Sequence, residues 1–318
     1  MSKQSRKLGV VVLVTGLCMN LFCPSIHGAD YMQKPVKLVV CTAAGGGEDM
    51  EARGIAPYLE KHLGRRIIID DQPGAGGKIA MEKFMKTEPD GNTLITFTLP
   101  KSVIYEYTDK VSFQTRGYTP VLAWSTSNQV LAVNANTWKT FDEFVKAAKT
   151  KTMAGGISGG HSQLGGLMAM DALGIKVNWV PYEGAAGSLA ALAGNHLDFL
   201  ITLSTSVVSL VDAGKLRPLI LFSNERDPYV PNVPTSKELG VKVTPIPGIR
   251  GILLPPKAPP AIVSVFEKAL SKAVAEPEFI EFAKRKKMLL HPLNSKEYGK
   301  AIAEVYPVVE QYKEVLNR

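Results

Sequence analysis

The stretch that decides the fold is Val36-Lys37-Leu38-Val39-Val40-Cys41-Thr42-Ala43-Ala44-Gly45-Gly46-Gly47-Glu48-Asp49, followed by Met50–Leu63. It predicts a buried strand, a glycine-rich turn and an amphipathic helix, because the apolar run stops at three consecutive glycines. Glycine allows backbone conformations that other residues avoid. We expect Asp49 to cap the helix, since its carboxylate can accept an N–H of the first turn. Free N–H groups and the helix dipole then favour an anion at this turn.

The same arrangement occurs twice more along the chain. A strand at Arg66–Asp70 runs into Gln72–Gly77 and a helix at Lys78–Lys86, and the turn Gly155–Ser162 precedes a helix at Gln163–Leu173. Any one such turn is common in α/β proteins and indicates no ligand by itself. Three of them in one chain favour a single anionic ligand that is held from several sides.

The order of the elements predicts an α/β fold with two lobes. Strands and helices alternate from residue 30 to 97 and again after residue 141, which is typical of mostly parallel sheets whose ligands lie at the carboxyl ends of the strands. The extended segment Val121–Val133 and the strand Ile249–Leu254 are expected to carry the chain out of one lobe and back. We therefore predict a type II periplasmic-binding arrangement, with residues 30–125 and 250–318 in lobe 1, residues 126–249 in lobe 2, a ligand cleft between them and closure about a hinge.

The first 29 residues predict an export signal. They have a basic start, an apolar core at Leu8–Phe22 that is too short to span a membrane, and small residues before a cleavage site near Ala29. Cys18 and Cys23 lie inside this segment without a convincing small-residue lipoprotein box. We therefore expect a mature periplasmic protein without an anchor, and a lipid anchor remains the alternative.

Charge and cysteine content exclude several classes of protein. Three of the 37 basic side chains belong to the signal, so against 29 acidic ones the mature chain has a net charge of +5. This mild excess, without a basic run, does not indicate nucleic acid. Cys41 is the one cysteine after the signal, so no internal disulfide is possible, and we expect it to be a small buried residue. No Cys/His spacing indicates a metal, and nothing indicates a cofactor.

From about Tyr31 onward the chain resembles the extracytoplasmic solute receptors of tripartite tricarboxylate transporters, the Bug receptors. The resemblance rests on many short motifs in the right order rather than on any one of them. They are Tyr31-x-x-Lys34-Pro35-Val36, Ala43-Ala44-Gly45-Gly46-Gly47-x-Asp49, Asp71-Gln72-Pro73-Gly74-Ala75-Gly76-Gly77, Pro89-Asp90-Gly91-Asn92-Thr93-Leu94, Ser158-Gly159-x-His161, Val180-Pro181-Tyr182-Glu183-Gly184, Gly194-Asn195-His196-Leu197-Asp198, Ala213-Gly214-Lys215-Leu216-Arg217, Arg250-Gly251 and Pro256-Lys257-Ala258-Pro259.

The resemblance implies a function and a set of site residues. Such receptors are not enzymes. They capture a small organic acid, here a dicarboxylate, a tricarboxylate or an aromatic carboxylate, and deliver it to membrane permease subunits; we expect a monomer. Their first two loops hold one carboxylate through backbone groups and ordered waters, and the facing lobe adds hydroxyl and backbone groups. The ligand-binding residues carried over to this chain are Thr42, Ala44, Gly45, Gly46, Asp49, Gly74, Ala75, Gly76, Ser158, Gly159, His161, Ser162, Tyr182 and Thr202.

Three positions depart from the family pattern. Cys41 stands where a proline is common, and Glu48 stands where a small polar residue is common. Glu48 should repel a carboxylate unless it points away or caps the helix. Thr202 stands where relatives that bind amino acids often carry an acid, so an ammonium group on the ligand would lack a counter-charge. We therefore expect an organic acid without an amine.

Structural roles compete with ligand contact at several of these residues. Asp49 can be a helix cap, His161 a structural histidine at a helix start, and Tyr182 a core residue. Arg250 has the chemistry of a carboxylate clamp. Because the family binds its ligands largely through water, we favour a hinge salt bridge for Arg250.

Two other classes of function are alternatives to the receptor. Gly156-Ile157-Ser158-Gly159-Gly160 fits the nucleophile elbow of α/β hydrolases, and Asp198 or Asp227 with His291 would complete the order Ser, Asp, His for an exported serine hydrolase. No oxyanion-hole motif stands upstream, so the enzyme is disfavoured. A sensor that presents its ligand to a membrane signalling partner would use the same clamp as a transport receptor.

Overall fold

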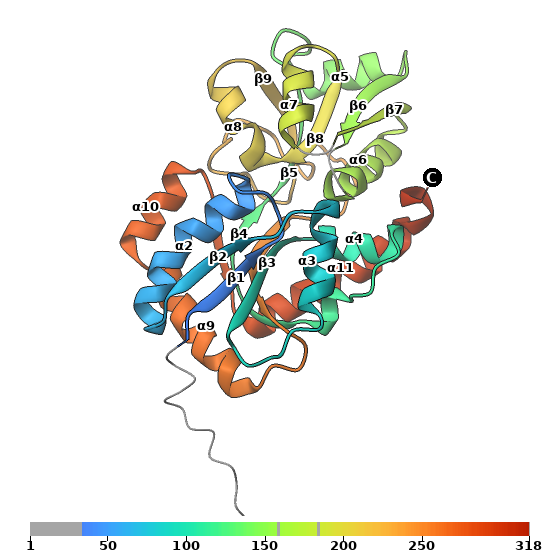
Figure 1. Ribbon diagram of the computed structural model, residues 1–318. Helices are drawn as coiled ribbons and strands as arrows, with labels where there is room; N and C mark the ends of the chain where they lie inside the picture. Colours follow the sequence, from blue (N-terminus) through green and yellow to red (C-terminus); the bar gives the residue numbers. More distant parts are fainter. Residues whose placement is uncertain (1–33, 158–159, 183–184, 318) are drawn as a thin grey trace, which may run out of the picture. The chain divides into compact units, whose positions relative to one another are not determined.

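The computed structural model describes residues 34–157, 160–182 and 185–317, and these form two β-sheets with helices on both faces of each (Figure 1). The predicted signal, Tyr31, Ser158, Gly159, Glu183 and Gly184 lie outside the described residues. The first sheet has six strands in the order β11-β4-β10-β3-β1-β2, and the second has five in the order β7-β6-β8-β5-β9. The predicted α/β fold with two βα lobes is confirmed.

Lobe 1 is built around the first sheet. Strands β1, β2 and β3 run parallel to one another, and β10 runs antiparallel to β3 and β4. The strands are β1 (Val36–Val40), β2 (Ile67–Asp71), β3 (Thr93–Leu99), β4 (Thr119–Ser127), β10 (Gly248–Leu254) and β11 (Leu289–Leu293). The helices are α2 (Gly47–Leu63), α3 (Lys78–Phe84), α4 (Lys101–Thr108), α9 (Pro260–Val274), α10 (Pro277–Arg285) and α11 (Ser295–Leu316), with short 3-10 turns η1 (Ala75–Gly77) and η2 (Thr115–Gly117).

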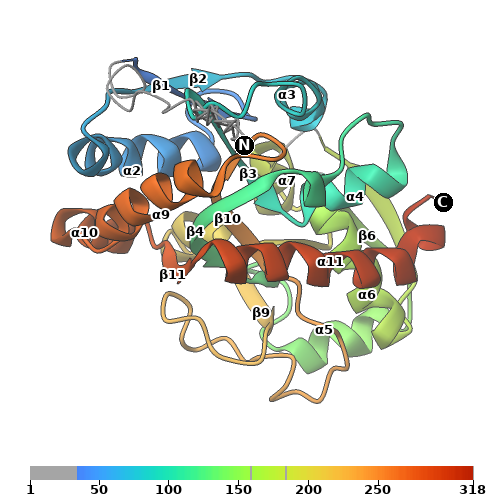
Figure 2. The ribbon, with the colours of Figure 1, turned by 90° about the horizontal axis from the view of Figure 1, so that it is seen from below.

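Alternating side chains of β1 show how this sheet is covered. Val36, Leu38 and Val40 pack with α2, α9 and α10, whereas Val39 packs on the other face with α3, α4 and α11. Successive residues of a strand point to opposite faces, so a strand that is apolar on both needs helices on both. The view from below shows α11 crossing the lobe in front of β4 and β10 (Figure 2).

Lobe 2 repeats the plan around the second sheet. Leu131 and Val133 of β5 pack with α5 and α6, and Val130 and Ala132 pack with α7 and α8. Its elements are β5 (Gln129–Asn134), α5 (Phe141–Ala148), β6 (Met153–Ile157), α6 (Gly160–Leu173), β7 (Val177–Pro181), α7 (Ala185–Ala193), β8 (Phe199–Leu203), α8 (Ser204–Asp212) and β9 (Leu216–Phe222).

Two segments connect the sheets. β4 ends at Ser127 and β5 begins at Gln129, so a single residue joins them on the outward path. Residues 223–247 return the chain to β10. Helix α6 serves both lobes, because Leu164 and Met168 belong to a core cluster of lobe 1 and Ala169 and Met170 to one of lobe 2.

The start of the first helix corrects one prediction. Helix α2 begins at Gly47 with Gly46 at the capping position and no side-chain cap, so Asp49 lies inside the first turn and is not the N-cap. Its carboxylate instead reaches back and accepts the N–H of Gly45 at 2.7 Å. The helix continues through Pro57 to Leu63, and Gly64 ends it at φ 69°.

A substitution at Gly251 tests how closely β10 approaches β4 in the first sheet. A Cβ at this position would lie 2.5 Å from both the Cα of Ala123 and the carbonyl oxygen of Leu122, in the neighbouring strand. Backbone cannot give way as a flexible side chain can. Gly251→Ala is therefore expected to lower the free energy of unfolding by about 2–3 kcal/mol in urea denaturation.

The matched control is Gly299→Ala in α11, where the added Cβ would meet only Pro120, at 3.5 Å. This exchange is expected to leave stability unchanged or raise it by up to about 1 kcal/mol, since alanine favours helix. Equal stability of the Gly251→Ala variant and the wild type would contradict the close approach of β4 and β10.

Candidate functional site

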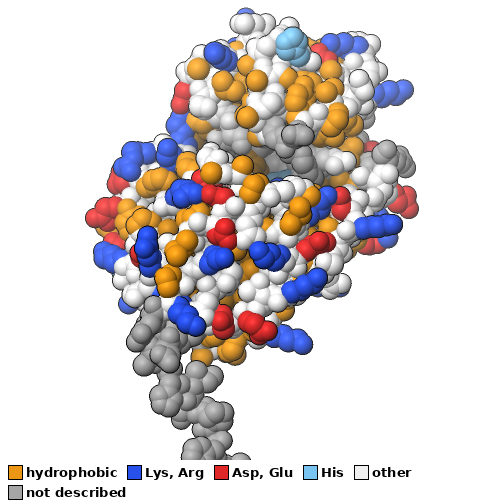
Figure 3. All heavy atoms as spheres, viewed as in Figure 1, with side chains coloured by type: hydrophobic (Ala, Val, Ile, Leu, Met, Phe, Trp, Pro, Cys, Tyr) orange, Lys and Arg blue, Asp and Glu red, His pale blue; other side chains and the backbone are white. Residues whose placement is uncertain are grey.

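The first two glycine turns lie side by side at the carboxyl ends of β1 and β2. The N–H of Gln72 donates to the carbonyl of Val40 at 2.9 Å, and a Cβ at Gly77 would lie 2.9 Å from the Cβ of Cys41. Only glycine permits this contact. Figure 3 shows the surface hollowed between the two lobes.

The first turn leaves backbone donors available for a ligand. Gly45 has φ +82° and places its N–H on the carboxylate of Asp49, which also pairs with Arg53 at 2.6 Å. The N–H groups of Gly47 and Glu48 have no acceptor among the residues described. They lie at the positive end of the α2 dipole, which favours an anion. The buried Oγ1 of Thr42 likewise has no partner in the described part of the chain.

The second turn is held in shape by Tyr105. Gly74, Ala75, Gly76 and Gly77 all have positive φ, and the Tyr105 hydroxyl donates to the carbonyl of Gly76 at 3.3 Å. A Cβ on Gly76 would lie 2.2 Å from that hydroxyl oxygen. Burial raises the pKa of Tyr105 to about 12, so it remains a neutral donor at physiological pH. The turn is therefore fixed with backbone exposed and little side chain above it.

The side chain of Glu48 points into the protein, away from the N–H groups at the start of α2 that favour an anion. Its carboxylate accepts the N–H of Cys41 at 3.2 Å and the hydroxyl of Thr98 at 3.4 Å. Burial raises the pKa of Glu48, opposed by the charges of Arg250 and Lys101 and by these two hydrogen bonds. The repulsion expected from its position in the sequence is thus reduced, because the Glu48 carboxylate is turned inward to these donors.

Arg250 forms a buried salt bridge with Glu51. Its Nη1 donates to the Glu51 carboxylate and its Nε donates to the Thr98 hydroxyl at 2.9 Å. Glu51 also accepts Trp124 Nε1 at 2.9 Å and the Ser125 hydroxyl at 2.6 Å. Strand register explains this convergence, since Arg250 lies opposite Thr98 on one side and Ser125 on the other.

One part of the Arg250 guanidinium still faces the turn. Nη2 lies 3.5 Å from the position that a Cβ on Gly47 would take. A carboxylate bound at the start of α2 would therefore meet a cation there as well as backbone N–H groups. The structural role favoured from the sequence is present, and it leaves room for ligand contact.

The third turn brings His161 to the same region. His161 Nε2 donates to the carbonyl of Ile246 at 2.9 Å, because a carbonyl oxygen can only accept. Its Cε1 lies 3.4 Å from a Cβ position on Gly248, two residues from Arg250. Burial, together with the charge of Arg250, lowers the pKa of His161 to about 4 against the opposing hydrogen bond to Ile246. His161 is therefore neutral at pH 7. Ser162 is buried beside it.

Two other predicted residues are not brought to the turns by any described contact. Tyr182 is half-buried against the apolar cluster of α7 and α8, and its N–H donates to the carbonyl of Ile157. Thr202 is buried within β8, where it pairs with Val130 of β5. Both lie on the lobe 2 side of the molecule.

Sequence reasoning missed two charged residues. Glu51 was one acidic residue on a predicted helix, and nothing local signalled its pairing with a residue 199 positions later. Lys101 was hidden in an irregular stretch, yet its charge acts on both Cys41 and Glu48. Its place after β3, with one residue between them, at the same sheet edge as the glycine turns, was the available signal.

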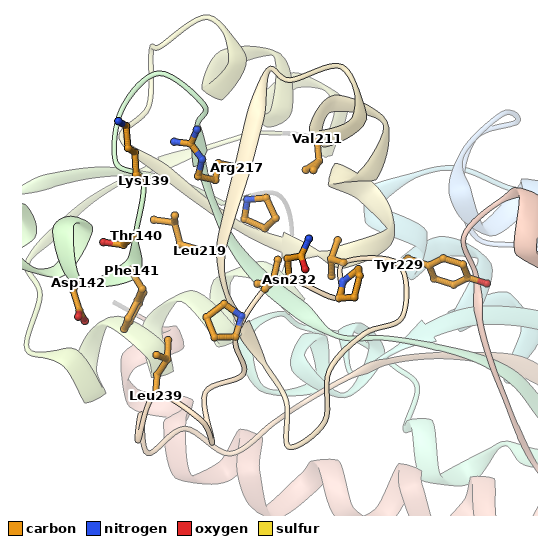
Figure 4. A pocket seen from close by; sticks show the side chains of 15 residues that line it. Lys139, Thr140, Phe141, Asp142, Val211, Arg217, Leu219, Tyr229, Asn232 and Leu239 are labelled. Carbon is orange, nitrogen blue, oxygen red and sulfur yellow. The ribbon is translucent and has the colours of Figure 1, made fainter.

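A separate hollow in lobe 2 contains none of these residues. This cavity of about 580 Å³ lies between the start of α5, β9 and residues 229–239. Figure 4 shows Lys139 and Arg217 at one end and Tyr229 directed away from the other labelled side chains. The Tyr229 hydroxyl donates to the carbonyl of Met288 in lobe 1 at 3.2 Å. Within the described ranges, no group of three His, Cys, Asp or Glu side chains is placed to hold a metal, and no helix is long and apolar enough to cross a membrane.

His161 gives a prediction about pH. The unfolded chain takes up a proton near pH 6.5, whereas the folded protein does so only near pH 4, so the contribution of neutral His161 to stability is present above pH 6.5 and lost as pH falls toward 4. Between pH 6.5 and 4 we expect the wild type to lose on the order of 3 kcal/mol of unfolding free energy through this residue. His161→Gln keeps a donor for the carbonyl of Ile246 and is expected to abolish this loss.

Urea denaturation of both proteins at several pH values between 4 and 7.5 measures the difference. Glu48 acts in the opposite sense, because its raised pKa makes the free energy of unfolding fall as pH rises. Both proteins contain Glu48, so subtracting the pH profile of the variant from that of the wild type removes its effect. Parallel profiles for the wild type and the variant would contradict a buried neutral His161.

Comparisons with known proteins identify the family of the chain. A family model described as "Tripartite tricarboxylate transporter family receptor" matches residues 51–315, well over half of the chain. A Cupriavidus necator protein, described as "UPF0065 protein in gbd 5'region", is 27% identical over 321 residues, covering 98% of this chain and 95% of the relative.

Two solved structures have the same fold. A TctC solute binding protein from Polaromonas, without ligand, has a TM-score of 0.75 and 27% identity, covering 89% of this chain and 98% of that one. MatC from Rhodopseudomonas palustris, with bound malate, has a TM-score of 0.76 and 25% identity, covering 89% and 99%. The resemblance inferred from the motifs is confirmed, and the chain belongs to the tripartite tricarboxylate transporter receptor family.

Proposed function

We propose that this protein is an extracytoplasmic solute-binding protein that captures a small organic carboxylate and delivers it to the permease subunits of a tripartite tricarboxylate-type transporter. The observation that carries the proposal is the group of donors at the start of α2. The N–H groups of Gly47 and Glu48 have no acceptor among the described residues, and Arg250 Nη2 lies 3.5 Å from a Cβ position on Gly47 in this receptor-family chain. Family membership and the malate bound to MatC support a carboxylate as the ligand.

The proposed site is assembled from both lobes. The two glycine turns provide backbone donors for one carboxylate, and the first turn of α6 faces them with its hydroxyl and imidazole groups. Backbone N–H groups suit carboxylate binding because they are already oriented before the ligand arrives. The proposed ligand-binding residues remain Thr42, Ala44, Gly45, Gly46, Asp49, Gly74, Ala75, Gly76, Ser158, Gly159, His161, Ser162, Tyr182 and Thr202.

The proposed ligand is an organic acid without an amine. Buried Thr202 offers no charge to an ammonium group. Near the first turn, the carboxylate of Asp49 already pairs with Arg53, and that of Glu51 already pairs with Arg250. A ligand ammonium would therefore be desolvated without a counter-ion, which is costly. Dicarboxylates, tricarboxylates and aromatic carboxylates all satisfy this condition.

We infer no catalysis and no cofactor. The acids that a hydrolase would recruit are engaged elsewhere, since Asp227 accepts the Ser204 hydroxyl at 2.8 Å and Asp198 pairs with Lys151 at 2.8 Å. His291 is exposed on β11. We further propose a periplasmic monomer, with the signal cleaved near Ala29 and the lobe boundaries at residues 125/126 and 249/250.

A binding test uses one site variant and one control. Gly47→Ala adds a methyl group 3.5 Å from Arg250 Nη2, in the proposed carboxylate position, at a helical residue that tolerates alanine. The wild type and this variant are screened by thermal shift and calorimetry against mono-, di- and tricarboxylates, aromatic acids and acidic amino acids. Gly299→Ala is the control.

One class of acid is expected to stabilise the wild type, by about 2.7 kcal/mol at a hundred times its dissociation constant. Gly47→Ala is expected to fold normally and to bind about tenfold more weakly, because the methyl group displaces the carboxylate from its N–H partners. A wild type that binds none of these acids would refute the proposal. Fluorophosphonate labelling that is lost in Ser158→Ala would then favour the hydrolase.

A further inference from the structure

Lys101 is a cation at the sheet edge where the glycine turns lie. It is the first residue of α4, directly after β3, whereas the turns follow β1 and β2. These three strands are parallel neighbours in the order β3-β1-β2, so their carboxyl ends share one edge of the sheet. The strand order therefore places Lys101 next to the first turn.

Contacts place the side chain of Lys101 at the second turn. Its Cε lies 3.8 Å from the Cβ position on Gly76, and its Nζ lies 5.7 Å from the centre of the Tyr105 ring. Its positive charge also acts on Cys41 and on Glu48, beside the first turn. The side chain of Lys101 thus contacts the second turn, and the strand order puts the first turn next to it.

The surrounding charges leave Lys101 without a counter-ion. Lys78, which also lies over the Tyr105 ring at 4.9 Å, pairs with Asp109 at 2.5 Å. Arg53 pairs with Asp49 and Asp71, and Arg250 pairs with Glu51. Lys101 forms no ion pair with any residue that the structure describes. Glu48 is a weak candidate for that role, since it is turned inward to other donors.

We propose that Lys101 is a specificity-determining residue that binds the ligand's carboxylate at the two glycine turns and excludes acids with an amine beside that carboxylate. The inference rests on the proposed function and adds to it. A direct ammonium–carboxylate contact is a charge-assisted hydrogen bond, stronger than a neutral one. It would supplement the backbone donors of Gly47, Glu48, Ala75 and Gly76.

Discrimination follows from like-charge repulsion. In a 2-amino acid the ammonium group is attached to the carbon next to the carboxylate, so it would enter the site close to Lys101. Like charges at such distances in a partly desolvated site disfavour binding. An acid with hydrogen or hydroxyl at that carbon has no positive charge there and is not repelled by Lys101. The same residue would thus raise affinity for the plain acid and lower it for the amino acid.

The test compares Lys101→Met with Lys78→Met in the mature protein. Both substitutions remove one cation beside Tyr105, but only Lys101 lacks a carboxylate partner among the described residues. Calorimetry measures binding of the acid that stabilises the wild type most in the thermal-shift screen, and of its 2-amino analogue, such as succinate with aspartate or glutarate with glutamate. Melting temperatures without ligand establish that each variant folds.

Lys101→Met is expected to weaken binding of the plain acid by about tenfold or more and to reduce the preference over the amino analogue. Lys78→Met is expected to change either affinity by less than about twofold. Wild-type affinity in the Lys101→Met variant, or a wild type that prefers the amino acid, would overturn this inference and leave carboxylate capture standing. A wild type that binds no acid would overturn both.

Discussion

The buried ion pair between Arg250 and Glu51 fixes the geometry on which the site depends. Two charges in a protein interior are favourable only when each is also hydrogen-bonded, because removing them from water is costly. Here the partners come from separate elements, with Thr98 on β3 and with Trp124 and Ser125 on β4. Satisfying one pair therefore aligns α2 with three strands. The start of α2, whose first N–H groups have no acceptor among the described residues, is held at a fixed place beside the return strand β10.

Glu48 and Glu51 lie one turn apart on α2, and their negative charges are accommodated in different ways. Glu51 is compensated by Arg250, whereas Glu48 is buried with neutral donors and its pKa is raised. Neither presents a bare negative charge at the turn. An incoming carboxylate thus meets backbone dipoles and the remaining face of Arg250, although residues 48–71 include six acids. The distribution of pairs, rather than the net charge, makes the turn suitable for an anion.

The fold was largely predictable because glycine turns and alternating apolar runs are local signals. The three turns, the helices after them and the two crossings between lobes all follow from residues close in sequence. Asp49 was misplaced by the same logic, since three glycines leave the first helical residue ambiguous, and its carboxylate satisfies Gly45 instead of the first turn. The roles of Glu51 and Lys101 were not readable, because they depend on strand order and on the register that sets Arg250 opposite Thr98, 152 residues earlier.

Helix α6 connects ligand contact to the relation between the lobes. Its strand connections belong to lobe 2, yet Leu164 and Met168 are buried in a lobe 1 cluster. At the start of the same helix, His161 is held by the carbonyl of Ile246 in the returning segment. A ligand shifts an equilibrium only by its different affinity for two states. We therefore expect closure to depend on a ligand that contacts both lobes at once, through the glycine turns of lobe 1 and the polar groups at the start of α6.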